Sequence, residues 1–190
     1  MHIRLALIVA YAALQACSSL PSAPAQEILD EQSGNTLLVV AKPLVFARTR
    51  TDVAAYARDY ATLVAVEVDQ SGKYSEFLLL YRWSTVDRRM SSPPDPHAGE
   101  LRILAEGRAI DLMPLERIPV SLSRRRELHV PDHGDVVAHA YAIDTATLGF
   151  IASSREVSVQ MPQERLDTPF TLWEDGRAAL GRFVQRAGAQ

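Results

Sequence analysis

The amino-acid sequence predicts a β-rich α+β domain: mostly antiparallel, sandwich-like sheets with two short helices, one of them C-terminal. Three observations predict it. Short segments rich in β-branched and aromatic residues recur along the chain, polar turns containing glycine separate several of them, and an apolar stripe at helical spacing lies near the C-terminus. An all-β sandwich is the alternative.

The first half of the domain is rich in strand patterns. Residues 36–47 (TLLVVAKPLVFA) predict one or two strands, and Pro43 marks an edge, a bend or a break within them. Residues 62–68 and 74–86 are stronger strand patterns joined by the polar segment DQSGK, so they predict a hairpin. Both faces of the second strand are apolar, which favours a covered, central strand with Trp83 in the core.

Shorter elements follow. Residues 87–99 predict a polar, proline-rich loop, and residues 123–134 a polar, irregular segment. The other strand patterns are a hairpin around Glu106-Gly107-Arg108 and single strands, at residues 101–105, 109–112, 118–122, 136–143, 156–161 and 170–173.

Two helices complete the expected fold. Asp144 is placed to cap the first, with Ile143 and Leu148 as a hydrophobic staple. Asp175 is placed to cap the second, whose apolar stripe comprises Ala179, Leu180, Phe183 and Val184.

Residues 1–20 (MHIRLALIVAYAALQACSSL) have the pattern of an export signal. Arg4 gives a positive start, an apolar run covers residues 5–14, and small residues follow. This run is too short to cross a bilayer, because ten helical residues rise only about 15 Å. The order Leu14-Gln15-Ala16-Cys17 resembles a lipobox, the processing signal of bacterial lipoproteins.

The lipobox resemblance implies that a diacylglycerol is attached to the Cys17 thiol, that the chain is cut before Cys17, and that the new amino group is acylated. Several acyl chains give stable anchoring where one is marginal. Ser18, where an aspartate would favour the inner membrane, implies the outer membrane. Cys17 is the sole cysteine, so an intramolecular disulfide is impossible. A plain secretory signal cut nearby is the alternative.

This reasoning predicts a signal peptide over residues 1–16, a lipidated tether over residues 17–35 and one domain over residues 36–190, facing the periplasm. Removing residues 1–16 removes Arg4 and no acid, which leaves 19 basic and 23 acidic residues and a formal charge of −4. Nucleic-acid-binding domains are usually basic, so we expect no nucleic-acid partner.

Imidazoles and carboxylates crowd one segment and could bind zinc: His129, Asp132, His133, Asp135 and His139. His129 and His133 would share a face only on a helix, which Pro131 and Gly134 oppose. No HExxH motif is present. A polar loop explains the segment better, so we expect no metal and no cofactor; His129, His133 and His139 are the candidate ligands in the alternative.

Motifs of catalysis are also absent from the sequence. It has no GxSxG nucleophile elbow and no glycine-rich phosphate loop, and the lipobox resemblance commits Cys17 to lipid. We therefore expect no enzyme, although a hydrolase remains a third alternative. The arginines at 88–89 and 124–126 are interpreted as solvated loop residues, with an anionic partner as the alternative.

The sequence thus favours a lipid-anchored, non-catalytic envelope protein that binds other envelope proteins or supports an envelope assembly. A periplasmic ligand- or metal-binding domain is the alternative. The loop of residues 87–99 is the best expected partner contact, because long polar loops on rigid scaffolds often carry function. For Trp173, core packing is favoured over a surface patch.

Overall fold

The computed structural model describes residues 25–86, 99–123, 126–133, 135–162 and 168–189. It confirms the predicted β-rich α+β class, with antiparallel pairing and a C-terminal helix. The strands are β1 Gln26–Asp30, β2 Asn35–Val39, β3 Leu44–Thr49, β4 Arg58–Asp69, β5 Tyr74–Ser84, β6 Leu101–Ala105, β7 Arg108–Leu112, β8 Val137–Ala142, β9 Val157–Gln160 and β10 Phe170–Glu174. The helices are η2 Val120–Leu122 and η3 Arg126–Leu128, both 3-10, and α2 Thr145–Ser153 and α3 Arg177–Ala187.

Strand β4 is the hub of the sheet. One of its edges pairs with β5 from Asp59 to Asp69, and β5 pairs in turn with β8. Its other edge is shared, because the first half pairs with β3 and the second half with β2. Two arms therefore leave this edge: β2–β1, and β3–β10–β9–β6–β7. Residues 61–68 of β4 are all buried, as expected of a strand covered on both faces.

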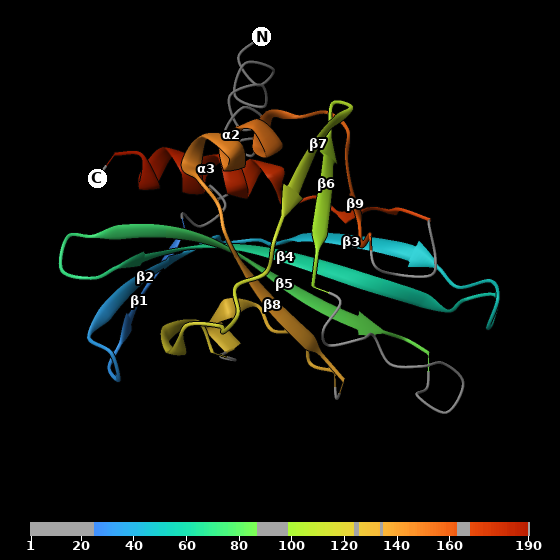
Figure 1. Cartoon of the computed structure of the whole chain (residues 1–190), viewed down its shortest axis with the longest axis horizontal. Helices are drawn as coiled ribbons and strands as arrows, with labels where there is room; N and C mark the ends of the chain where they lie inside the picture. Colours follow the sequence, from blue (N-terminus) through green and yellow to red (C-terminus); the bar gives the residue numbers. More distant parts are fainter. Residues whose placement is uncertain (1–24, 87–98, 124–125, 134, 163–167, 190) are drawn as a thin grey trace, which may run out of the picture.

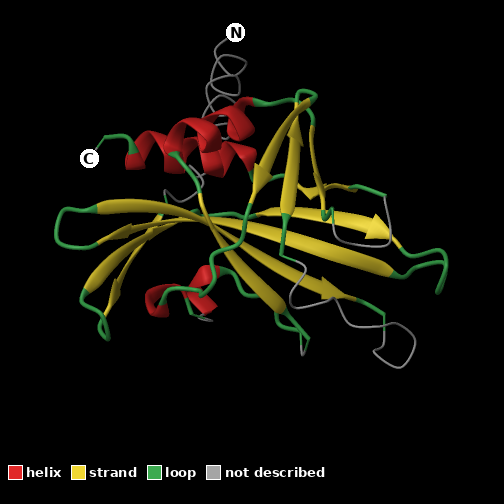
Figure 2. Ribbon diagram, viewed as in Figure 1, coloured by secondary structure: helices red, strands yellow, loops and turns green. Residues whose placement is uncertain are grey.

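The longer arm folds over the hub. Figure 1 shows β6 and β7 running steeply across the direction of β4 and β5, which gives a sandwich-like arrangement of layers. One hydrophobic cluster joins the layers, and its largest fully buried side chains include Tyr81, Tyr141, Phe46, Phe170 and Phe183. Figure 2 shows α2 and α3 on one side of the strands and the two 3-10 helices on the other.

Of the two predicted helix N-caps, the one at α2 is confirmed and the one at α3 is not. Asp144 caps α2 as predicted, because its side chain accepts a hydrogen bond from the Thr147 amide. The predicted cap of α3 was wrong by one position. Gly176 is the N-cap residue of α3, and Asp175 instead accepts from the Arg177 amide at 2.9 Å and pairs with the Arg177 guanidinium.

Two segments differ from their expected structure. Residues 118–122 were predicted as a strand, but residues 120–122 form η2, because Pro119 cannot donate to a ladder and its carbonyl accepts from Leu122. Residues 26–30, expected in the tether, form β1 and pair with β2, so the folded domain starts before residue 36.

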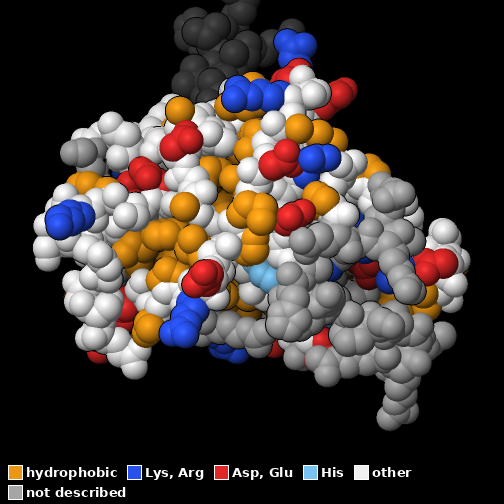
Figure 3. Space-filling model, viewed as in Figure 1, with side chains coloured by type: hydrophobic (Ala, Val, Ile, Leu, Met, Phe, Trp, Pro, Cys, Tyr) orange, Lys and Arg blue, Asp and Glu red, His pale blue; other side chains and the backbone are white. Residues whose placement is uncertain are grey.

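Several expected features lie outside the described residues. These are Cys17 with the whole lipobox, residues 87–98 of the proline-rich loop, and four of the loop arginines. Within the described ranges, every helix is too short or too polar to span a bilayer. On the face visible in Figure 3, acidic and basic side chains are interspersed among apolar ones.

Candidate functional site

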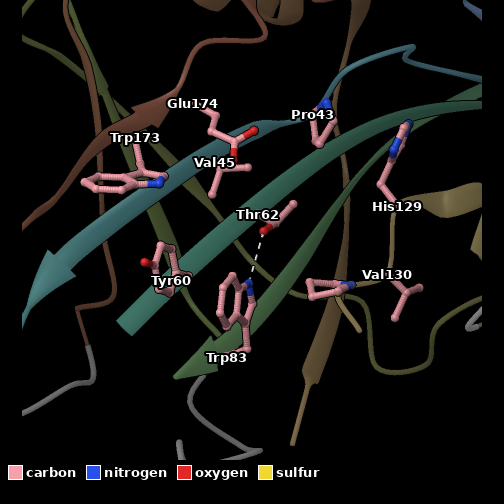
Figure 4. A pocket seen from close by; sticks show the side chains of 10 residues that line it. Pro43, Val45, Tyr60, Thr62, Trp83, His129, Val130, Trp173 and Glu174 are labelled. Carbon is pink, nitrogen blue, oxygen red and sulfur yellow. Dashed lines mark hydrogen bonds between the residues drawn. The ribbon is translucent and has the colours of Figure 1, made fainter. Parts of the chain in front are cut away.

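An open pocket of about 340 Å³ lies where β3, β4, β5 and β10 meet the segment after η3. Figure 4 shows its lining side chains arranged around the strands, with Trp173 and Glu174 on one side, Trp83 below and His129 opposite. The complete lining is Pro43, Val45, Tyr60, Thr62, Trp83, His129, Val130, Pro131, Trp173 and Glu174.

Strand pairing places the floor of the pocket. Side chains alternate between the two faces of a strand, and residues directly opposite each other share a face. Thr62 lies opposite Val45 on β3, and Tyr60 lies opposite Trp83 on β5. These four side chains therefore project from the same face of the sheet, aromatic at one end and small at the other.

A β-bulge in β10 supplies the next wall. Leu172 pairs with Phe46 and Glu174 pairs with Val45, so Trp173 is an extra residue on this strand. An inserted residue resets the alternation beyond it and re-aims the neighbouring side chains. Glu174 consequently comes to the face of Val45, beside Trp173, and both line the pocket.

The rings form a continuous ladder. Tyr60 and Trp83 stack with their ring centroids 4.0 Å apart and their planes inclined by 8°. Trp83 also stacks on His133, with ring centroids 4.6 Å apart. Trp173 meets Tyr60 edge to face at 6.3 Å, and the Arg58 guanidinium lies 4.8 Å from the centroid of Trp173. Such contacts contribute about 0.5–1.5 kcal/mol per aromatic pair beyond burial, which orders the ladder.

His129 holds the opposite wall in an unusual conformation. Its φ is 54°, in the left-handed region that non-glycine residues seldom adopt. Its ring Nε2 is 2.8 Å from the carbonyl oxygen of Val40, and this hydrogen bond ties the segment after η3 to the residue that follows β2. Backbone strain of this kind persists where the surroundings fix it, and it concentrates at binding sites.

The polar groups of the pocket are few and differ in kind. The indole N–H of Trp83 donates to the Thr62 hydroxyl over 3.4 Å, longer than the usual range for N–H···O. The indole nitrogen of Trp173 is on the side of its ring that faces Val45 and Glu174 (Figure 4). Within the described part of the chain, the side chains of Trp173 and Glu174 make no hydrogen bond or ion pair.

The structure does not bring together the three histidines that are the zinc ligands of the alternative interpretation. His129 binds a carbonyl, His133 is exposed and stacks on Trp83, and His139 lies on β8, facing the other side of the sheet through its pairing with Leu80. Across the residues described, no group of three or more potential ligands is placed to hold a metal ion.

The prediction that Trp173 packs in the core was wrong, because 54% of this residue is exposed. The local sequence does carry a sign of this exposure. In a regular strand, Trp173 points to the same side as the exposed Thr171 and away from the more buried Phe170 and Leu172. Trp83 is only half-buried, so the apolar face of β5 is core at its centre and pocket wall at its end.

The arrangement is suited to binding. It offers a floor of aromatic, aliphatic and hydroxyl side chains, ordered ring edges, one carboxylate, and an imidazole already hydrogen-bonded to a carbonyl. In comparisons with known proteins, no family model, no curated protein and no solved structure matches the chain.

Proposed function

We propose that the chain is a lipid-anchored, non-catalytic protein of the cell envelope that binds a partner protein through the pocket at Trp173. The observation that carries the proposal is the exposure of Trp173, 54% of the residue, beside an ordered aromatic ladder. Single exposed apolar residues are common on proteins, whereas an exposed tryptophan at the rim of a built pocket is not.

The pocket has the chemistry of a protein-binding hot spot. Tryptophan, tyrosine and arginine carry most of the energy of protein interfaces, and here Trp173, Tyr60 and Arg58 adjoin one another. The volume is at the lower end of ligand sites, which suits the side chains of a short segment better than a bulky cofactor.

The membrane anchor and the location of the protein are the second part of the proposal. The lipobox resemblance at Cys17 supports acylation and a place at the outer membrane, with the domain facing the periplasm. A tethered domain samples partners at a high local concentration, so a small pocket suffices for function.

Capture experiments test the binding half. The full chain, recovered from envelope extracts at native levels, should bring down a partner in constant ratio, and Trp173→Ala should lose it. Tyr74→Ala is the matched control, because Tyr74 is also partly exposed but lies at the far end of the β4–β5 hairpin. Equal recovery by wild type and Trp173→Ala would reject the pocket as the binding site.

Mass spectrometry of the membrane-extracted protein tests the proposed lipid anchor at Cys17. We expect a chain beginning at Cys17 and carrying added acyl mass, and Cys17→Ser should release the protein from the membrane fraction. A water-soluble chain with a free Cys17 thiol would overturn the anchor while leaving the pocket proposal intact.

A further inference from the structure

The hydrogen-bonding groups of the pocket show what a ligand must supply. The Trp173 N–H has no acceptor in the described part of the chain, and the Trp83 N–H has only a long bond to Thr62. The two tryptophans therefore leave unused hydrogen-bond donor capacity in and beside the pocket. A well-matched ligand brings hydrogen-bond acceptors, because a donor covered without one costs about 1–3 kcal/mol.

The orientation of the rings agrees with this requirement. Aromatic faces are electron-rich and attract cations, whereas ring edges are electron-poor. Tyr60 and His133 stack on Trp83, and the Arg58 cation already lies over Trp173. The ladder thus presents ring edges to a ligand more than open faces, which favours oxygen acceptors over a stacked cation at this point.

Peptide carbonyls on an extended segment are the acceptors that fit. A polyproline II helix has no internal hydrogen bonds, so all its carbonyls are available, and its prolines bring apolar rings without N–H groups that need partners. Pro43, Val45 and Pro131 provide apolar surface for those rings. Docking of a preformed polyproline II helix in an aromatic-lined groove is an established mode of peptide recognition.

Glu174 adds a preference in charge. The bulge brings its carboxylate to the pocket, where it pairs with no cation of the described chain. We propose that the pocket binds an extended, proline-containing segment of a partner protein, with a lysine or arginine of that segment at Glu174. This inference rests on the proposed partner-binding function and specifies the kind of segment bound.

Intrinsic fluorescence offers a direct test, because the chain has two tryptophans and both line the pocket. The probe is a blocked oligoproline peptide with one arginine, titrated into the full chain. We expect a saturable change in tryptophan emission. The same peptide with alanine for proline should bind at least about tenfold more weakly, because its unbound state is less ordered and its side chains are smaller.

Variants of the protein separate the contacts. By calorimetry, Trp173→Ala should weaken binding by about 30-fold, as expected for an aromatic hot spot. Trp173→Phe keeps a ring but loses the N–H, and should weaken binding by about 3- to 10-fold. Glu174→Gln should weaken the arginine peptide but not an oligoproline without charge. Circular dichroism confirms that each variant is folded.

Different failures are distinguishable. Equal binding of the proline and alanine peptides, preference for a glutamate-substituted peptide, or no response at millimolar concentration would each overturn the inference. A captured partner that depends on Trp173 but binds through a segment without proline would also overturn it, while the proposed function would stand. Peptide binding without any captured partner would instead count against the proposed function.

Discussion

Tyr60 and Trp83 face each other across β4 and β5, stacked with their ring centroids 4.0 Å apart. Directly opposed positions hold their Cβ atoms close enough for rings to pack in parallel. The pairing fixes the inner end of the aromatic ladder before any ligand arrives, so little side-chain entropy is lost on binding there. The pocket is therefore preorganised at this end and open at Trp173.

The stacked pair should contribute measurably to stability. Tyr60→Leu removes the ring contacts of Tyr60 with both tryptophans while keeping an apolar side chain. We expect it to lower the free energy of unfolding by about 1 kcal/mol more than Tyr74→Leu, whose ring makes no aromatic contact in the described structure. Urea denaturation followed by circular dichroism measures both. Equal losses would show that the stacking adds nothing to burial.

Glu67 should make the protein less stable as the pH rises. Glu67 is 2% exposed, and burial raises the pKa of its carboxyl above 4.5, with Glu76 and Asp69 adding repulsion. Between 4.5 and this raised pKa the folded state binds more protons than the unfolded state, so this group's contribution falls with increasing pH.

Glu67→Gln removes that titration. Its stability relative to wild type should therefore increase as the pH rises through the same window and then level off. Glu31→Gln, which removes the same charge from an exposed turn, is the control. Denaturation at a series of pH values gives the two difference curves, and a flat curve for Glu67→Gln would contradict the assignment.

Local sequence patterns were sufficient to predict the elements that short-range interactions determine. The hairpin of β4 and β5 follows from two apolar runs and a turn with Gly72 at φ 86°, and the cap of α2 follows from Asp144 three residues before Thr147. Of the edge, bend or break expected at Pro43, the structure has the break, between β2 and β3.

The pocket was not predictable in the same way, because its causes are non-local. The bulge at Trp173 is a slip of register against β3, far away in the sequence, and the αL conformation of His129 is tied to the carbonyl of Val40. Neither contact leaves a pattern near the residue concerned. The one local sign that Trp173 is exposed was its position two residues after the exposed Thr171, on the same side of a regular strand.

His139 should have the opposite pH dependence from Glu67. Burial lowers the pKa of its imidazole below 6.5, and the Arg82 cation lowers it further. Between the folded pKa and 6.5 the unfolded state binds more protons, so stability is lost as the pH falls through this window. His139→Gln should lose less stability than wild type between about pH 7.5 and about pH 5.5.

The matched variant is His133→Gln, which changes an exposed imidazole. It should retain the decrease in stability on acidification that His139 causes. If His139→Gln and wild type lose the same free energy of unfolding over this range, the buried imidazole is not the group responsible.

Two glycines of the C-terminal region should respond oppositely to alanine. A Cβ at Gly176 would clash with the backbone carbonyl oxygens of Pro43 and Lys42. Gly176→Ala should therefore cost about 1–3 kcal/mol and push the end of β10 away from the pocket wall at Pro43. A Cβ at Gly181 meets only Ala152, at 4.0 Å, so Gly181→Ala should gain about 0.5–1 kcal/mol of helix stability.

Thermal unfolding and tryptophan emission together check this pair. Gly176→Ala should lower the melting temperature and shift the emission, because Trp173 and Pro43 line the same pocket. Gly181→Ala should raise the melting temperature and leave the emission unchanged. The same shift in emission for both variants would mean that the pocket responds to α3 as a whole, and the close approach of Gly176 to Pro43 would then not be what holds Trp173 in place.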